Sequence, residues 1–180
     1  MNRVINFYNY DQCFAFYTKR IMNIRQAKIH GEVIMAKPVL LLAIIDGIDA
    51  QVFCKNEFTI NEWLENRYYT LMSKYVSKSQ FKDITGLEKP FWHLETDGFW
   101  HIMYPGLILP KSSTPSLRWI KDNISFAYFD DELWLLLQNQ EWRIKLRDYI
   151  VENKLTHDDK RLEKIISDGL GIFAFLLLSA

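Results

Sequence analysis

The chain has 180 residues, which is long enough to bury the core of one domain. Hydrophobic residues make up 49% and aromatic residues 15% of it, a composition that excludes a disordered chain and predicts a core rich in aromatic rings. The 22 basic and 22 acidic side chains cancel to a formal charge of zero, so no global positive field indicates a nucleic-acid partner.

Charge is uneven along the chain, because residues 1–40 carry six Lys or Arg against two acids. An anion-binding face would draw on this basic segment and on lysines further along: Lys19, Arg20, Arg25, Lys28 and Lys37, with Lys74, Lys78, Lys82 and Lys89. A solvated helix face is the competing interpretation of the same pattern.

The cysteine pattern and the chain ends favour a cytoplasmic protein. Cys13 and Cys54 are far apart and lack CxxC spacing, which argues against a disulfide framework and against a zinc cluster. No signal peptide is visible at the N-terminus. The final "LGIFAFLLLSA" is about half of the roughly 20 residues that span a bilayer, so we expect no membrane insertion.

Two helices are expected first. Asp11 is expected to cap a helix with Phe14, Tyr17, Ile21 and Ile24 at helical spacing, and Gly31 to stop it. In "AKPVLLLAIIDGID", Pro38 suits a first helical turn, and residues 39–45 are apolar on every side, which predicts a central helix ending near Gly47. Residues 51–53 are expected to form a short strand.

"TINEWLENRYYTLMSKY", residues 59–75, is the clearest helix. Thr59 and Glu62 form a capping-box pair, and one face carries apolar side chains at helical spacing: Leu64, Tyr68, Leu71, Met72 and Tyr75.

"PFWHLETDGFWHI", residues 90–102, is expected to be a β-hairpin. Hydrophobic alternation predicts two strands, and Asp97-Gly98 provides the turn chemistry between them. The proline-rich stretch 103–116 is expected to be a loop.

Three more helices are expected towards the C-terminus. Asp130 is expected to cap "DELWLLLQ", and the next helix carries Trp142, Leu146, Tyr149 and Ile150 at helical spacing. Thr156 with Asp159 is expected to open the last helix, bent at Gly169 and Gly171.

These elements predict an α+β fold that is predominantly helical, with a winged-helix-like core, an aromatic β-hairpin and an appended C-terminal helix. We expect a recognition domain at 1–154, and a helix at 155–180 that packs on it or mediates association.

The chemistry of residues 90–102 leaves alternatives open. His93 and His101 would meet across the hairpin near Glu95 and Asp97, but a zinc site needs three or four ligands, so packing or hydrogen-bonding histidines are the favoured interpretation. Nucleophile elbows, phosphate loops and dinucleotide motifs are missing from the sequence, so we expect no catalytic residue, no metal and no cofactor. Trp and Phe beside Lys89 suit a nucleic-acid reader, although such rings more often form core.

Three segments in order resemble a known family: "KPVLLLAIIDGID", "PFWHLETDGFWHI" and "ISFAYFDDELWLLLQNQEWRIKLRDYIVE". Over residues 9–154 the chain resembles the N-terminal region of predicted HNH-type restriction endonucleases, whose best understood relatives are sulfur-binding domains that recognise phosphorothioate-modified DNA. The resemblance implies a helical DNA-binding domain with an apolar pocket for the sulfur. The chain departs from the family at Ala36, where a polar residue is common, and at Lys89, where an aromatic residue is common.

The resemblance implies roles for particular residues. Pro90 and Phe91 would line the pocket, Lys37 would lie near the DNA backbone, and Arg118 would flank the site. We therefore place the DNA or sulfur pocket at Lys89, Pro90, Phe91, Trp92, His93 and Arg118, and the phosphate contacts at Lys19, Arg20, Arg25, Lys28 and Lys37.

Our first hypothesis is a cytoplasmic, non-catalytic protein of a restriction or defence system that binds double-stranded DNA and reads a modification. The HNH nuclease motif of longer relatives is missing from the sequence, since His157 is the one histidine after His101, and we expect no DNA cleavage. The rival hypothesis is an interaction module that forms a homodimer or docks a nuclease partner through its C-terminal helix. An enzyme of another class is the third alternative.

Overall fold

The structure is a computed structural model that describes residues 9–29, 32–75, 85–106 and 114–155. Helices dominate it, and two short antiparallel strand pairs complete an α+β fold, which confirms the predicted fold class. The helix predicted after residue 155 lies outside the described residues.

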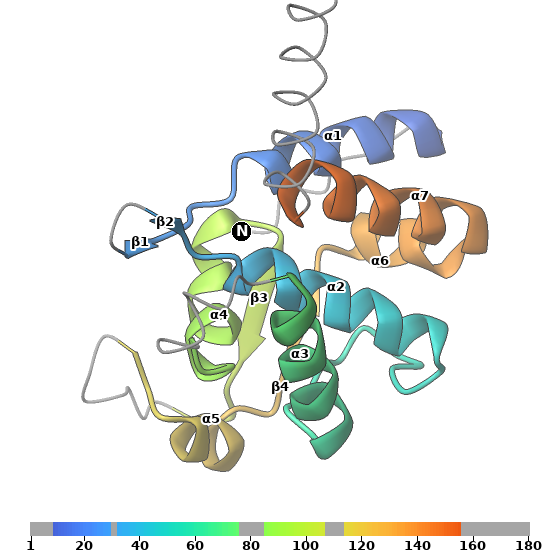
Figure 1. Ribbon diagram of the computed structural model, residues 1–180. Helices are drawn as coiled ribbons and strands as arrows, with labels where there is room; N and C mark the ends of the chain where they lie inside the picture. The colour runs from blue at the N-terminus through green and yellow to red at the C-terminus, as the bar shows by residue number, and fades with distance from the viewer. Residues whose placement is uncertain (1–8, 30–31, 76–84, 107–113, 156–180) are drawn as a thin grey trace, which may run out of the picture.

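Helix α2 (Ala36–Asp49) forms the centre of the molecule, as its apolar sequence predicts. Residues 39–45 are buried on all sides. On one side of it in Figure 1 lie α1 (Tyr10–Met22), α6 (Asp131–Gln138) and α7 (Gln140–Ile150). On the other side lie α3 (Glu62–Tyr75), α4 (Glu88–His93) and α5 (Leu117–Asn123). Of these helices, α3, α4, α6 and α7 pack on α2 and cover apolar side chains that would otherwise be exposed to water.

The two strand pairs are small. β1 (Lys28–Ile29) pairs with β2 (Glu32–Val33) just before α2. β3 (Trp100–Met103) pairs with β4 (Phe126–Phe129), in a register that sets Trp100 opposite Phe129 and Met103 opposite Phe126. Phe58 extends this second pair through an isolated bridge to Ala127.

The aromatic core predicted from composition centres on Trp100. Its indole N–H donates to the carbonyl oxygen of Phe91 at 2.9 Å, and its ring stacks on Phe58 with centroids 5.6 Å apart. Phe91 and Phe129 meet the same indole edge-on. Because a buried indole N–H needs an acceptor, this bond fixes α4 against β3.

The hairpin predicted for residues 90–102 is wrong in its first half. Residues 88–93 form α4, and the 3₁₀ helix η2 (Leu94–Asp97) continues it to Gly98, whose φ of +78° ends the turn. Pro90, Phe91 and Leu94 are buried, which is the spacing of a helical face. The strand partner of β3 is β4, a segment for which the sequence analysis predicted no strand.

Other boundaries also differ. α1 is capped by Asn9, whose side chain accepts from the amide of Gln12, instead of Asp11, and it ends at Met22, well before Gly31. α2 continues past Gly47 to Asp49. The strand predicted at 51–53 is a turn, with Gln51 at a φ of 57°.

Two predicted caps have different partners in the structure. Asn61, and not Thr59, accepts the amide of Leu64 at the start of α3. Asp130 precedes α6 as predicted, but its side chain makes no capping bond there. Its carboxylate instead accepts from Tyr17 at 3.0 Å and pairs with His101 at 2.6 Å, which ties α1 and β3 to the start of α6.

Lastly, Asn139 caps α7, because its side chain accepts from the amides of Glu141 and Trp142, and the π-helical turn η3 (Val151–Leu155) follows the helix. No helix of the described part of the chain is long and apolar enough to cross a membrane.

Candidate nucleic-acid interface

A pocket of about 450 Å³ lies where the start of α2, the chain before it and the short helix α4 meet. We call it the Pro90 pocket. Its lining residues are Arg25, Gln26, Ala27, Ile34, Ala36, Lys37, Thr85, Lys89, Pro90, His93 and Thr96.

The carboxylate of Asp97 holds two walls of this pocket together. It accepts from the backbone amide of Arg25 at 3.0 Å and pairs with the ammonium of Lys37 at 2.7 Å. The side chains of Asp97 and Lys37 are 5% and 12% exposed, so water screens the pair little. Lys37 therefore carries its charge at the pocket in a fixed position, with one side already engaged by an anion.

His93, the last residue of α4, is also held in place at the pocket. Its Nε2 lies 2.7 Å from the hydroxyl oxygen of Thr114. Burial and the nearby charge of Lys37 lower the pKa of His93, so the ring is neutral at pH 7. A neutral imidazole offers one donor and one acceptor nitrogen, and an anion arriving in the pocket would favour its protonation.

A buried lysine, Lys154, holds the side chain of Gln26, which lines the pocket. Lys154 is 9% exposed, and its ammonium donates to the carbonyl oxygen of Met22 at 2.7 Å and to Gln26 Oε1 at 3.1 Å. Gln26 Nε2 in turn donates to the carbonyl oxygen of Ile34 at 3.0 Å. Burial lowers the pKa of Lys154 although Asp97 opposes the shift. The turn η3 after α7 is thereby fixed to a wall of the Pro90 pocket.

Five of the residues singled out in the sequence come together at this pocket. They are Arg25, Lys37, Lys89, Pro90 and His93. Arg25 and Lys89 are exposed, while Pro90 is buried in the wall. Three cations thus surround a lining that includes the Pro90 ring, Ala27, Ile34 and Ala36.

The structure places three other predicted pocket residues away from this lining. Phe91 is 1% exposed and packs in the core against Trp100. Trp92 is half-buried on the other side of α4, against Trp119 and Tyr104. Arg118 on α5 is 92% exposed and pairs with Asp122 at 3.6 Å.

The remaining predicted phosphate contacts lie on α1 and β1. Lys19 and Lys28 are exposed and do not line the pocket. Arg20 donates to the carbonyl oxygen of Gly98 at 2.7 Å and covers the ring of Phe16, so it braces the turn after η2.

The two histidines of the metal alternative are engaged separately, His93 with Thr114 and His101 with Asp130. In the described ranges no group of three or more His, Cys, Asp or Glu side chains is arranged to hold a metal ion.

Reasoning from the sequence missed Asp97 as the anchor of Lys37 and Thr114 as the partner of His93. Asp97 precedes a glycine, which is the pattern of a hairpin turn, and a turn carboxylate is usually solvated. Thr114 is far from His93 along the chain, so no local pattern connects them. Gln26 and Ile34 likewise carry no recognisable motif.

Chemically, the Pro90 pocket suits an anion that carries a weakly hydrated atom. The cations at its walls attract negative charge, and the hydrocarbon of Pro90, Ala27 and Ile34 makes no hydrogen bond to an entering group. A hard oxygen would lose water there without replacement, whereas a soft atom would lose less.

Two solved structures share this fold. The sulfur binding domain of ScoMcrA complexed with phosphorothioated DNA matches with a TM-score of 0.57 at 20% identity, over 78% of this chain and 87% of that chain. The structure of the sulfur binding domain and SRA domain of ScoMcrA complexed with phosphorothioated DNA matches with a TM-score of 0.57 at 22% sequence identity. The match covers 75% of this chain and 41% of that chain. No family model and no curated protein matches this chain. The likeness confirms the sulfur-binding-domain-like fold that the sequence resemblance implied.

Proposed function

We propose that the chain binds double-stranded DNA at the Pro90 pocket and reads a phosphorothioate linkage there. The observation that carries this proposal is the convergence of Arg25, Lys37 and Lys89 around the ring of Pro90 in one pocket. The shared fold supports it, because both neighbours are described in complex with phosphorothioated DNA. We assign these residues recognition and no bond cleavage.

In this proposal, different residues bind the soft sulfur atom and the charged phosphate backbone. A phosphorothioate replaces one non-bridging phosphate oxygen by sulfur, which is larger and less strongly hydrated. The Pro90 ring would face the sulfur at a small desolvation cost, while Arg25 and Lys89 would contact the charged backbone on either side. Lys37 contributes less than a free cation would, because Asp97 neutralises part of its charge.

His93 would complete the contact. It lies in the same pocket lining as Pro90 and Lys89, and its ring is held by Thr114. A negative phosphate beside it favours the imidazolium form, which donates from both nitrogens.

The general part of the proposal, DNA binding through these cations, is tested by the salt dependence of duplex affinity. Each phosphate contact that is lost should make the negative slope of the logarithm of the association constant against the logarithm of salt concentration less steep by about one. It should also weaken binding to any DNA sequence. We expect this from Lys89→Gln, which removes an exposed cation of the pocket. Fluorescence anisotropy with one labelled unmodified duplex at several salt concentrations measures it.

Lys145→Gln is the matched control. Lys145 is a partly exposed lysine on α7 that pairs with Glu141 and does not line the Pro90 pocket. It should leave the slope unchanged. An equal effect of the two substitutions, or a wild-type affinity that does not depend on salt, would contradict DNA binding at this pocket.

A further inference from the structure

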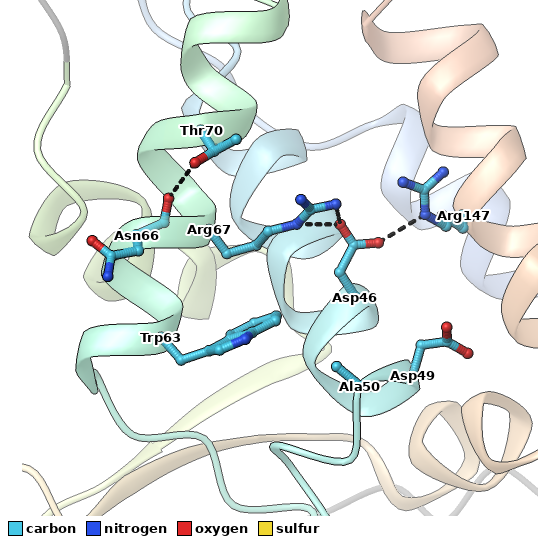
Figure 2. Close-up of a pocket in the computed structure, with 8 residues that line it drawn as sticks. All are labelled: Asp46, Asp49, Ala50, Trp63, Asn66, Arg67, Thr70 and Arg147. Carbon is cyan, nitrogen blue, oxygen red and sulfur yellow. Dashed lines mark hydrogen bonds and ion pairs between the residues drawn. The ribbon is translucent and has the colours of Figure 1, made fainter.

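A second pocket, of about 600 Å³, lies between α2, α3 and α7. We call it the Asp46 pocket. Figure 2 shows its lining residues: Asp46, Asp49, Ala50, Trp63, Asn66, Arg67, Thr70 and Arg147.

Asp46 positions two arginines in this pocket. Arg67 Nε donates to Asp46 Oδ2 at 2.8 Å, and Arg147 Nε donates to Asp46 Oδ1 at 2.7 Å. Figure 2 shows the two guanidinium groups reaching the carboxylate from opposite sides. Burial of Arg147 disfavours its charged form, but the hydrogen bond to Asp46 and the charge of Asp46, with smaller contributions from Tyr75 and Asp148, together raise the pKa of Arg147.

The two guanidinium groups retain donors that the described residues do not use. Arg67 spends its Nε and Nη2 on Asp46, and Arg147 spends its Nε; in the described parts of the chain no hydrogen bond engages Arg67 Nη1 or the terminal nitrogens of Arg147. The two side chains are 35% and 32% exposed, whereas Asp46 is 10% exposed. These N–H groups are therefore available to a ligand in the pocket.

The charge of the pocket also favours an anion. Asp49 pairs with Arg143 at 2.8 Å, so their charges cancel. Among the residues that line the pocket, Arg67 and Arg147 then carry two positive charges against the one negative charge of Asp46, and Asp148 acts on Arg147 from outside the lining. A single arginine would already compensate Asp46, so a structural ion pair accounts for one of the two cations and leaves one that no carboxylate of the lining compensates.

Trp63 adds an aromatic wall. Its half-buried indole meets the ring of Phe53 edge-on, with centroids 6.3 Å apart. Figure 2 shows it extending from α3 towards α2, alongside Arg67. An aromatic surface next to two arginines is a combination that binds a base and a phosphate.

We propose that the Asp46 pocket binds the phosphate group of a nucleotide through Arg67 and Arg147, with the base against Trp63. Guanidinium groups match phosphate with paired N–H donors, and a pocket of this volume suits a ligand of nucleotide size. Asp46 acts as the positioning residue that holds both arginines.

This site is separate from the Pro90 pocket. Lys37 and Asp46 are nine residues apart on α2, which corresponds to about 14 Å along the helix axis and to opposite helix faces. The inference therefore does not depend on the proposed DNA binding.

Isothermal titration calorimetry of the full chain at constant ionic strength tests the proposal with three probes: adenosine 5′-monophosphate, inorganic phosphate and adenosine. We expect saturable binding of the nucleotide, weaker binding of phosphate and the weakest binding of adenosine. Arg147→Gln should weaken nucleotide binding by about tenfold or more, since it removes charge-assisted hydrogen bonds. Lys145→Gln, the same charge change two residues away, should alter it by less than about twofold.

Arg147→Lys provides a second variant that keeps a cation near Asp46 but removes the guanidinium fork. It should also weaken nucleotide binding, and it decides the question if Arg147→Gln does not fold. Absence of saturable binding of the nucleotide and of phosphate to the wild-type chain would overturn the proposal, as would equal losses in Arg147→Lys and Lys145→Gln. Equal affinities for phosphate and nucleotide would retain the phosphate site and overturn the role of Trp63.

Discussion

Asp97, Lys37 and His93 define the electrostatics of the Pro90 pocket. Asp97 fixes the ammonium of Lys37, and that ammonium together with burial disfavours a second positive charge on His93. The pocket thus keeps two separate kinds of donor, a charged one held by a carboxylate and a neutral ring held by Thr114. Neither relation is visible in the sequence, because Asp97 and Lys37 are 60 positions apart.

The lowered pKa of His93 predicts a pH dependence of stability. Just below pH 6.5, the ordinary pKa of histidine, His93 stays neutral in the folded chain but becomes protonated in the unfolded chain. The unfolded chain then binds more protons than the folded chain, so the free energy of unfolding falls as the pH falls below 6.5. We expect His93→Gln to lose less stability than the wild type between pH 7.5 and 5.5. Urea unfolding at both pH values measures the difference.

The comparison is internally controlled, because His101 and the other titrating groups are the same in both chains. Identical losses of stability on acidification in the wild type and in His93→Gln would show that His93 is not held neutral by its surroundings.

Helix types and burial patterns were predictable where the apolar period was long. The all-apolar sequence of α2 and the stripe of Leu64, Tyr68 and Leu71 on α3 identified both helices, because burial on one or all faces repeats over three or more turns. Residues 90–94 were misassigned because alternation over five residues also fits a helical face. β4 and α5 are short, and their identity depends on tertiary partners that the sequence does not display.

The residues of the candidate site likewise fall into those that could be found from the sequence and those that could not. Lys37 and Lys89 were first identified from the uneven charge along the chain, whereas Pro90 was found through a resemblance, which carries information on distant contacts that local patterns lack. Gln26, Thr96 and Asp97 were missed because their positions follow from how α2, α4 and the chain before β1 pack together.

The start of α3 gives a test at the level of an element. The sequence pattern assigns the N-cap to Thr59, whereas in the structure Asn61 accepts the amide of Leu64 at 2.9 Å and Thr59 is exposed. We expect Asn61→Ala to lower the free energy of unfolding by about 1 kcal/mol, the usual value of a lost cap. Thr59→Ala should change it by less than about 0.5 kcal/mol. Urea unfolding of both variants distinguishes the two caps, and a larger effect at Thr59 would contradict the structure.

At the scale of the whole molecule, α2 separates two pockets of different character. Its first turn lines the Pro90 pocket, where three cations surround apolar hydrocarbon. Its last turns line the Asp46 pocket, where two arginines share a carboxylate (Figure 2). The near-zero formal charge of the chain conceals both sites, because each concentrates positive charge that acids elsewhere cancel. Composition alone therefore gave no indication of an anion-binding surface.

The most direct test of the central claim compares one duplex in three forms: unmodified, and with a single phosphorothioate in each of its two diastereomers. The Pro90 pocket lies on one side of any bound linkage, so we predict tighter binding of one diastereomer than of the other and of the unmodified duplex. Pro90→Ala should remove that preference while salt-dependent binding of unmodified DNA persists. Equal affinities for all three duplexes in the wild-type chain, or a preference that survives Pro90→Ala, would contradict sulfur recognition at this pocket.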